Sequence, residues 1–302
     1  MMKIKITMLL MGLVFTVPAA FAQELFGGEE NTLADHWDLG DHEHDDKDLF
    51  VIRTYKPVYV LAAKVSNNVN RMPHSDNPDR NVDEPIPLNK TEQMFQLSLK
   101  TKVLNDVFGG EQGGDIWVGY TQASFWQVFN TDLSRPFRET NYEPEAMFIF
   151  PVRYRLFGMN GVFMGLGFNH QSNGRANPLS RSWNRVVAQV GMEGKNTSVV
   201  FKPWWRLPEK EADDDNPGIE NYLGRSELLV AWKKGIHSVN CTARHSLRLG
   251  DNNRGNIRLA YSINIVDNLK FHAQVFTGYG ESMIDYNHRQ TVVGFGLSLV
   301  EW

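Results

Sequence analysis

Several common structural features are missing from this chain of 302 residues. It has one cysteine, Cys241, so no internal disulfide can form and the fold must be stable without one. After the N-terminus no segment holds eighteen consecutive apolar residues, which excludes a transmembrane helix. The 35 acidic and 31 basic side chains nearly balance, so no basic surface for nucleic acid is expected. Segments with the helical period of apolar residues are also absent.

The N-terminus, in contrast, has the three parts of a secretory signal peptide. Lys3 and Lys5 supply its positive charge, and an apolar run follows over 6–17. Ala20-Phe21-Ala22 is a small-x-small cleavage site. The apolar run is too short to span a membrane as a helix, so we expect residues 1–22 to be removed on export.

The next segment, 23–48, is predicted to be a periplasmic arm that precedes the folded domain, 49–302. Its second half is rich in aspartate and histidine. His36, His42 and His44 make a metal site conceivable. The favoured interpretation is a solvated arm whose charge keeps it out of the bilayer.

The pattern that the chain does have is alternation of period two. In 95–102, 257–264 and 269–275 one face is apolar and the other is polar or charged. The segments of this kind are centred near Val58, Leu97, Tyr120, Phe148, Leu166, Val187, Trp204, Leu228, Thr242, Leu259, Ala273 and Leu297. Twelve is an even number, as in single-chain outer-membrane barrels. A closed barrel also pairs every backbone polar group, which hydrocarbon requires.

The connections between these segments alternate in length. Those after even strands are mostly short, such as 194–196, 234–235 and 266–268. Those after odd strands tend to be longer: 67–89, 130–142, 171–183 and 209–220. Aromatic residues near strand ends are expected to form girdles at the two membrane surfaces: Trp117, Trp126, Trp204, Trp205, Trp232 and Tyr279. The sequence therefore predicts an all-β, twelve-stranded antiparallel transmembrane barrel in the outer membrane of a Gram-negative bacterium.

Three polar side chains are predicted on the lipid-facing wall near the outer rim. Leu166 and Phe168 belong to an apolar, lipid-facing row, and counting on by twos adds His170 and Ser172. On the next strand the same rule turns Asn184 outward. Polar groups facing lipid are costly unless they are paired, and by default they indicate function.

Their residue types suit nucleophilic catalysis. A serine is a weak nucleophile until a base takes its proton, and His170 is placed to do so for Ser172. Asn184 can accept a hydrogen bond from the imidazole ring and fix its tautomer, although it brings no charge. The alternative is that His170 and Ser172 are merely polar residues close to a loop.

The loop that joins the two strands offers further groups. A tight turn at Asn173-Gly174 can aim backbone amides at a developing oxyanion. Arg175, Asn177 and Ser180 offer carbonyl and side-chain oxygens, the ligands that a hard cation such as Ca²⁺ prefers. None of them carries a negative charge, so a single chain is expected to bind calcium weakly.

The same stretch resembles the signature of the bacterial outer-membrane phospholipase A family. The similarity lies in His170-Gln171-Ser172-Asn173-Gly174-Arg175 and in the run Ser180-Arg181-Ser182-Trp183-Asn184-Arg185. Four further runs match the family: 137–144, 214–217, 278–282 and 284–287. The resemblance covers nearly all of the mature chain.

This resemblance implies a twelve-stranded barrel that is a calcium-dependent phospholipase, active as a homodimer on sn-1 and sn-2 acyl esters of glycerophospholipids and lysophospholipids. Ser172 would be the nucleophile, His170 the base and Asn184 its orienting residue. The amide of Gly174 would belong to the oxyanion hole.

Calcium and dimer contacts also follow from the resemblance. The Arg175 carbonyl, the Ser180 side chain and the partner subunit's Ser134 would hold Ca²⁺. The family often carries aspartate where this chain has Asn177, a departure that removes a carboxylate. Gln122 matches a position at the dimer interface, and the alternation of residues along its strand also turns it toward lipid. The alternative is a glutamine at headgroup level. Two other functions remain open, a lipid A deacylase and a passive barrel.

Overall fold

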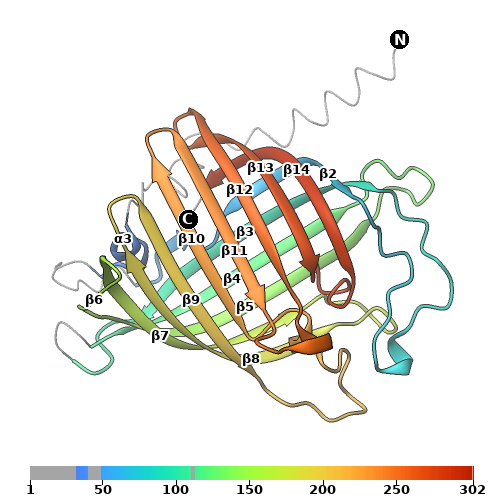
Figure 1. The fold of residues 1–302 in the computed structure, drawn as a ribbon, viewed down its shortest axis with the longest axis horizontal. Coiled ribbons are helices and arrows are strands. Elements are labelled where there is room, and N and C mark those ends of the chain that lie inside the picture. Colours follow the sequence, from blue (N-terminus) through green and yellow to red (C-terminus); the bar gives the residue numbers. More distant parts are fainter. Residues whose placement is uncertain (1–31, 40–48, 110–112, 301) are drawn as a thin grey trace.

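Twelve long antiparallel strands form a closed barrel in the part of the chain that the structure describes (Figure 1). The structure is a computed structural model that describes residues 32–39, 49–109, 113–300 and 302. The strands are β2 (Val58–Ser66), β3 (Thr91–Leu104), β4 (Asp115–Trp126), β5 (Phe137–Pro151), β7 (Met159–Ser172), β8 (Ser182–Glu193), β9 (Thr197–Arg206), β10 (Ser226–Lys234), β11 (His237–His245), β12 (Gly255–Val266), β13 (Leu269–Tyr279) and β14 (Arg289–Val300). Each pairs with its neighbour in sequence, and β14 pairs with β2 to close the ring. The predicted twelve-stranded barrel is confirmed.

The remaining described elements are short. β1 (Ile52–Thr54) pairs with β3, and β6 (Arg155–Leu156) pairs with β7. α3 (Leu33–Trp37) is an α-helix of 5 residues. Three single 3₁₀ turns lie in loops: η2 (Pro78–Arg80), η3 (Ile219–Asn221) and η4 (Gly250–Asn252). Across the described ranges, every helix is too short or too polar to cross a membrane.

The alternation in sequence becomes an apolar outside and a charged inside. In β3, Leu97 is exposed on the outer face, whereas Ser98, Lys100 and Lys102 are buried in the interior. The buried charges are paired, as burial requires. For example, Lys102 lies 2.9 Å from Asp115.

The connections at the two ends of the barrel mostly differ in length, as predicted, although 105–114 at the end with the short turns is long. The turns 194–196, 235–236 and 267–268 are short, whereas 67–90, 207–225 and 246–254 are long. Figure 1 shows α3 and β6 at one end and the 67–90 connection at the other. The long connections identify the outer end, where the candidate site lies.

The described part of the N-terminal arm enters the barrel instead of lying in solvent. Leu33 and Trp37 are buried, and Trp37 packs edge-on against Trp117. The Lys100 ammonium donates to the His36 carbonyl and lies 4.2 Å from the centroid of the Trp37 ring. The prediction of a solvated arm is therefore wrong for these residues, because apolar and cation–π contacts hold them against interior side chains of the barrel.

The proposed metal site in the arm has no counterpart in the described residues. His36 is buried among aromatic rings, and no group of three histidine, cysteine or acidic side chains that could hold a metal is found there. His42 and His44 lie outside the described residues.

Two of the tryptophans predicted for the girdles are interior residues. Trp117 is completely buried and Trp204 nearly so, whereas Trp205 is 61% exposed and Trp232 is 37% exposed. Because neighbouring residues on a strand face opposite sides, Trp204 and Trp205 cannot both face lipid. Proximity to a strand end therefore predicts which side a residue faces less well than the alternation of residues along the strand does.

Candidate active site

His170 and Asn184 face each other across two paired strands. The register of β7 and β8 places the two residues directly opposite each other. The His170 Nδ1 lies 2.8 Å from the Asn184 Oδ1. Because an amide oxygen only accepts hydrogen bonds, this contact assigns the proton to Nδ1 and leaves Nε2 as the basic nitrogen.

The outward orientation predicted from parity is also observed. Leu166 and Phe168 on the outer face are 53% and 45% exposed, whereas the next residue, Asn169, is buried in the interior. His170 and Ser172 continue the outer row and are half-buried. The two residues thus share one face at the outer end of β7.

Ser172 lies on the same outer face as His170, but it is not hydrogen-bonded to the histidine. It lies opposite Tyr142 of β5 and Ser182 of β8. Its hydroxyl has no hydrogen-bond partner among the described residues. Long serine–histidine contacts are common before substrate binds, when the reacting geometry tightens.

A group of three bonded interior side chains, Asn169, Arg185 and Glu143, lies next to the histidine–asparagine pair. The sequence reasoning did not find it. Asn169 and Arg185 are the pair next to His170 and Asn184 in the register. Asn169 donates to the Glu143 Oε1 at 2.9 Å, and Arg185 forms an ion pair with the same oxygen at 3.1 Å. These contacts join β5, β7 and β8 at the level of the site. Glu143 and Arg185 stand in the runs that resemble the phospholipase family, but nothing local in the sequence indicates their contact.

The loop after Ser172 is held by one buried side chain, Asn173. Its amide nitrogen donates to the Glu139 Oε1 at 3.1 Å and to the Leu179 carbonyl at 2.8 Å. Its amide oxygen accepts from the backbone N–H groups of Arg175 at 3.2 Å and Arg181 at 3.0 Å. A satisfied buried amide of this kind rigidifies the turn that follows.

Gly174 adopts the left-handed conformation that favours glycine, with φ of 59°. A Cβ added there would lie 2.9 Å from the Tyr142 ring. Its backbone N–H has no acceptor within the described part of the chain. This donor therefore remains available for a negatively charged oxygen near Ser172.

The segment between β13 and β14 folds into the barrel and supports the site from inside. The backbone N–H of Ile284 donates to the Glu139 Oε1 at 2.8 Å, and that of Met283 donates to Asn141 at 3.0 Å. Arg138 pairs with Asp285 at 3.0 Å. The family-like run 137–144 thus contacts the segment 278–287, which holds two more of these runs, 278–282 and 284–287.

A carboxylate joins the candidate cation ligands, although the sequence offered none. Ser180 donates from Oγ to the Asp215 Oδ2 at 2.5 Å, and the other oxygen of Asp215 pairs with Arg80 at 2.6 Å. Asp215 belongs to the 214–217 run, which is remote in sequence. Hydroxyl and carboxylate oxygens are suitable donors for Ca²⁺, so this corner of the site fits a hard cation. Arg175 and Asn177 are exposed beside it.

Ser134 and Gln122 lie away from this loop. Ser134 is exposed in the connection 127–136 with φ of 57°, where a second molecule can reach it. Gln122 is half-buried on the outer wall. It accepts from the Tyr120 hydroxyl at 3.0 Å and donates to Ser124 at 3.2 Å. Its amide is therefore already paired along its own strand, and it is not isolated in lipid.

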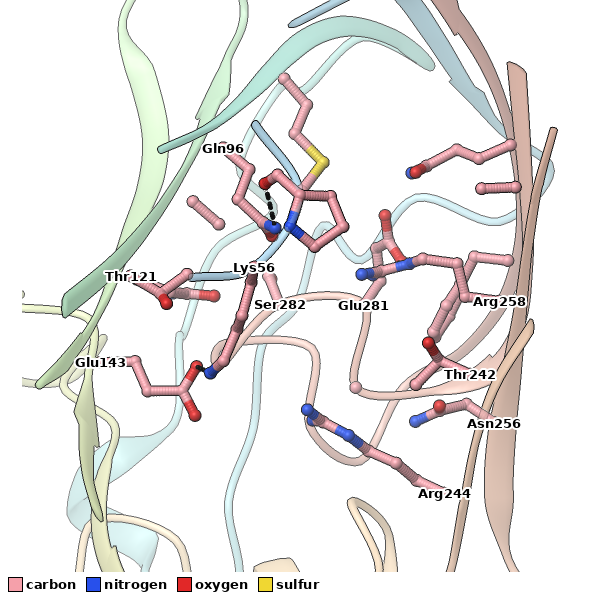
Figure 2. Close-up of a pocket in the computed structure, with 18 of the residues that line it drawn as sticks. Lys56, Gln96, Thr121, Glu143, Thr242, Arg244, Asn256, Arg258, Glu281 and Ser282 are labelled. Atoms are coloured by element: carbon pink, nitrogen blue, oxygen red, sulfur yellow. Dashed lines mark hydrogen bonds and ion pairs between the residues drawn. The ribbon is translucent and has the colours of Figure 1, made fainter. Parts of the chain in front are cut away.

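The interior of the barrel is a paired ionic network, not a second reaction centre. Figure 2 shows Lys56 and Glu143 on one wall facing Arg244 and Arg258 on the other, across a cavity of about 160 Å³. Lys56 pairs with Glu143 at 3.0 Å, and Arg258 pairs with Glu281 at 3.2 Å. Ion pairs that join side chains inside the lumen give little support to a passive channel.

Comparison with known proteins gives one consistent result. The family model described as phospholipase A1 matches residues 33–299. A putative phospholipase A1 of Neisseria meningitidis serogroup B is 37% identical over 263 residues, which are 84% of this chain and 67% of that protein. The phospholipase A1 of Escherichia coli K12 is 38% identical over 210 residues, 70% of each chain.

Solved structures agree with this result. The outer membrane phospholipase A from Escherichia coli superposes with a TM-score of 0.74 at 33% identity, covering 83% of this chain and 99% of that one. The outer membrane phospholipase dimer with bound calcium from Salmonella typhi gives a TM-score of 0.75 at 32% identity, covering 87% and 95%.

Proposed function

Because this chain belongs to the phospholipase A1 family and is a phospholipase A of the Gram-negative outer membrane, we propose that it hydrolyses both sn-1 and sn-2 acyl esters of glycerophospholipids and lysophospholipids. The observation that carries this proposal is the 2.8 Å contact between His170 and Asn184 on the outer wall, beside Ser172. A lipid ester in the outer leaflet reaches this wall directly.

The chemistry follows from these three side chains. Ser172 Oγ attacks the ester carbonyl carbon while His170 Nε2 takes its proton. The resulting tetrahedral intermediate expels the lysolipid alkoxide, which receives that proton from His170. Water, activated by the same nitrogen, then cleaves the acyl-serine to free fatty acid and serine. Asn184 holds the ring in the tautomer that keeps Nε2 facing Ser172.

The negative oxygen of the intermediate needs donors. The N–H of Gly174 is free to supply one hydrogen bond. Ca²⁺ would be held by the Arg175 carbonyl, the Ser180 hydroxyl and the partner subunit's Ser134, and when bound it would supply positive charge for the oxyanion. Asp215, hydrogen-bonded to Ser180, adds a carboxylate to this donor set.

The proposed active form is a homodimer, with Gln122 in its interface. The relative from Salmonella typhi is a dimer with bound calcium. In this chain a partner's Ser134 would complete a calcium site that a single chain leaves short of ligands. The hydrogen bonds that Gln122 makes with Tyr120 and Ser124 can be exchanged for bonds across a two-fold axis.

A substrate assay tests the proposal. With purified protein in mixed micelles and saturating calcium, we expect release of both acyl chains from phosphatidylethanolamine and of the remaining chain from its lyso form. Lipid A should be a poor substrate, cleaved at least about tenfold more slowly, a difference of 1.4 kcal/mol in transition-state binding. Faster cleavage of lipid A would instead support the deacylase alternative.

Asn184→Ala should impair hydrolysis but less than loss of the nucleophile does. Its role is to orient His170, and an unrestrained ring still samples the active tautomer. We expect a loss in kcat about 100-fold smaller than that caused by Ser172→Ala. Steady-state kinetics on a folded, heat-modifiable barrel measures this. Equal losses in the two variants would assign Asn184 a more direct part in the reaction.

A further inference from the structure

Glu209 lies in the chain that continues β9 (Thr197–Arg206) past Asn184 of the site. Arg185 pairs with Arg206 in the β8–β9 register. The backbone N–H of Leu207 then donates to the Asn184 carbonyl at 2.8 Å, which extends the pairing by one residue. Glu209 follows Leu207 by two residues, whereas Ser182, two residues before Asn184, lies opposite Ser172 and donates its backbone N–H to the Asn216 side chain at 2.9 Å.

The face of this extension is also defined. Trp205 and Leu207 are exposed on the outer wall, 61% and 37%. By the alternation of an extended chain, Glu209 follows them on that wall. Adjacent strands are about 4.8 Å apart, so the chain that continues β9 lies about two strand spacings from His170 and Ser172 on β7. Consistent with this placement, the Glu209 carboxyl interacts electrostatically with His170.

The carboxylate of Glu209 is partly buried and has no hydrogen-bond partner. Its Oε1 is fully covered, yet no donor reaches it in the described part of the chain. Burial raises the pKa of the Glu209 carboxyl above its ordinary value. A covered carboxylate without a donor is unfavourable, so its retention needs a compensating charge or a function.

The charged groups around Glu209 come from three elements: Arg206 at the end of β9, Asp214 and Asp215 in the same loop, and His170 on β7. Arg206 gives the larger attraction to Glu209, and its guanidinium is shared with Asp214 at 2.7 Å and Glu220 at 3.4 Å. The two aspartates repel the carboxylate. His170, once protonated, is the second cation that attracts Glu209, and it is the one whose charge changes during the reaction.

The reaction creates a need for such a charge. When Ser172 attacks, His170 becomes a cation, and the neutral amide of Asn184 orients the ring without balancing that charge. We propose that Glu209 is a positioning residue that supplies this missing negative charge and stabilises the imidazolium of His170 during hydrolysis. This inference rests on the proposed serine hydrolase function.

Removing the charge has a defined kinetic signature. Glu209→Gln should lower kcat about tenfold with little change in KM, because the imidazolium forms only after substrate binds. Without the carboxylate, protonation of His170 in the free enzyme is also less favourable. The base then stays neutral to lower pH, so the acidic limb of the kcat/KM profile should move to lower pH. A merely structural role would not shift this limb.

The experiment uses the full-length barrel in micelles at saturating calcium, with folding verified by heat-modifiability. Glu211→Gln is the matched control, because it removes an equal charge from an exposed side chain two residues away. Glu209→Asp keeps the charge and should restore at least half of the lost kcat and the wild-type limb. A Glu209→Gln profile that superposes on wild type, or the same shift in Glu211→Gln, overturns the proposal.

The same series separates this inference from the function on which it rests. Inactive Ser172→Ala together with unaffected Glu209→Gln would refute only the role of Glu209. Active Ser172→Ala would refute the serine hydrolase assignment itself.

Discussion

Ser172→Ala should reduce phospholipid hydrolysis by roughly three orders of magnitude or more while leaving the barrel folded. In the proposed mechanism the alanine removes the oxygen that His170 activates, so no covalent acyl intermediate can form. The hydroxyl has no hydrogen-bond partner among the described residues, so its loss leaves no donor or acceptor unsatisfied. Release of fatty acid from phosphatidylethanolamine at saturating calcium measures the effect.

The control for this variant is Ser182→Ala. Ser182 lies directly opposite Ser172 on β8, so the substitution removes a hydroxyl from the same row of the wall. It should leave activity within about threefold of wild type, the range usual for substitutions away from the reacting groups. Retention of more than about a tenth of activity in Ser172→Ala would remove that serine from the role of nucleophile.

Removal of calcium should lower hydrolysis about 100-fold or more and shift the protein from dimer to monomer. Loss of one oxyanion-stabilising group costs about 10²- to 10³-fold in kcat. If the partner subunit's Ser134 completes the site, calcium binds the dimer more tightly than the monomer. By linkage, it must then favour dimerisation, and a substrate-like acyl inhibitor bound in the shared cleft must do the same.

Sedimentation in detergent, with calcium or with chelator, measures this coupling together with activity. Ser180→Ala should raise the calcium concentration needed for half-maximal activity. Gln122→Ala should weaken the dimer and activity together without unfolding the barrel. A monomer fully active at saturating calcium, or a dimer indifferent to calcium and inhibitor, would contradict the coupling but leave the assignment of Ser172 and His170 intact.

The fold and the outer-wall site could be predicted because both depend on local parity. Period-two alternation identified the twelve strands, since a barrel wall has one apolar and one polar face. The same counting turned His170, Ser172 and Asn184 outward, and the 2.8 Å contact of His170 with Asn184 agrees with it. Where proximity to a strand end replaced parity, as for Trp117, the prediction was wrong.

The sequence by itself thus determined which residues face lipid, how many strands cross the membrane, and which short motif is the candidate for the chemistry. Only the tertiary structure decided what surrounds that motif. Asp215 reaches Ser180, and Glu143 joins Arg185, from connections or strands that are distant in the chain. Likewise Leu33 and Trp37 of α3 pack into a cluster of interior residues of the barrel. Parity is a property of neighbouring residues, whereas these contacts depend on ring closure and on the folding of long loops, neither of which leaves a periodic trace in sequence.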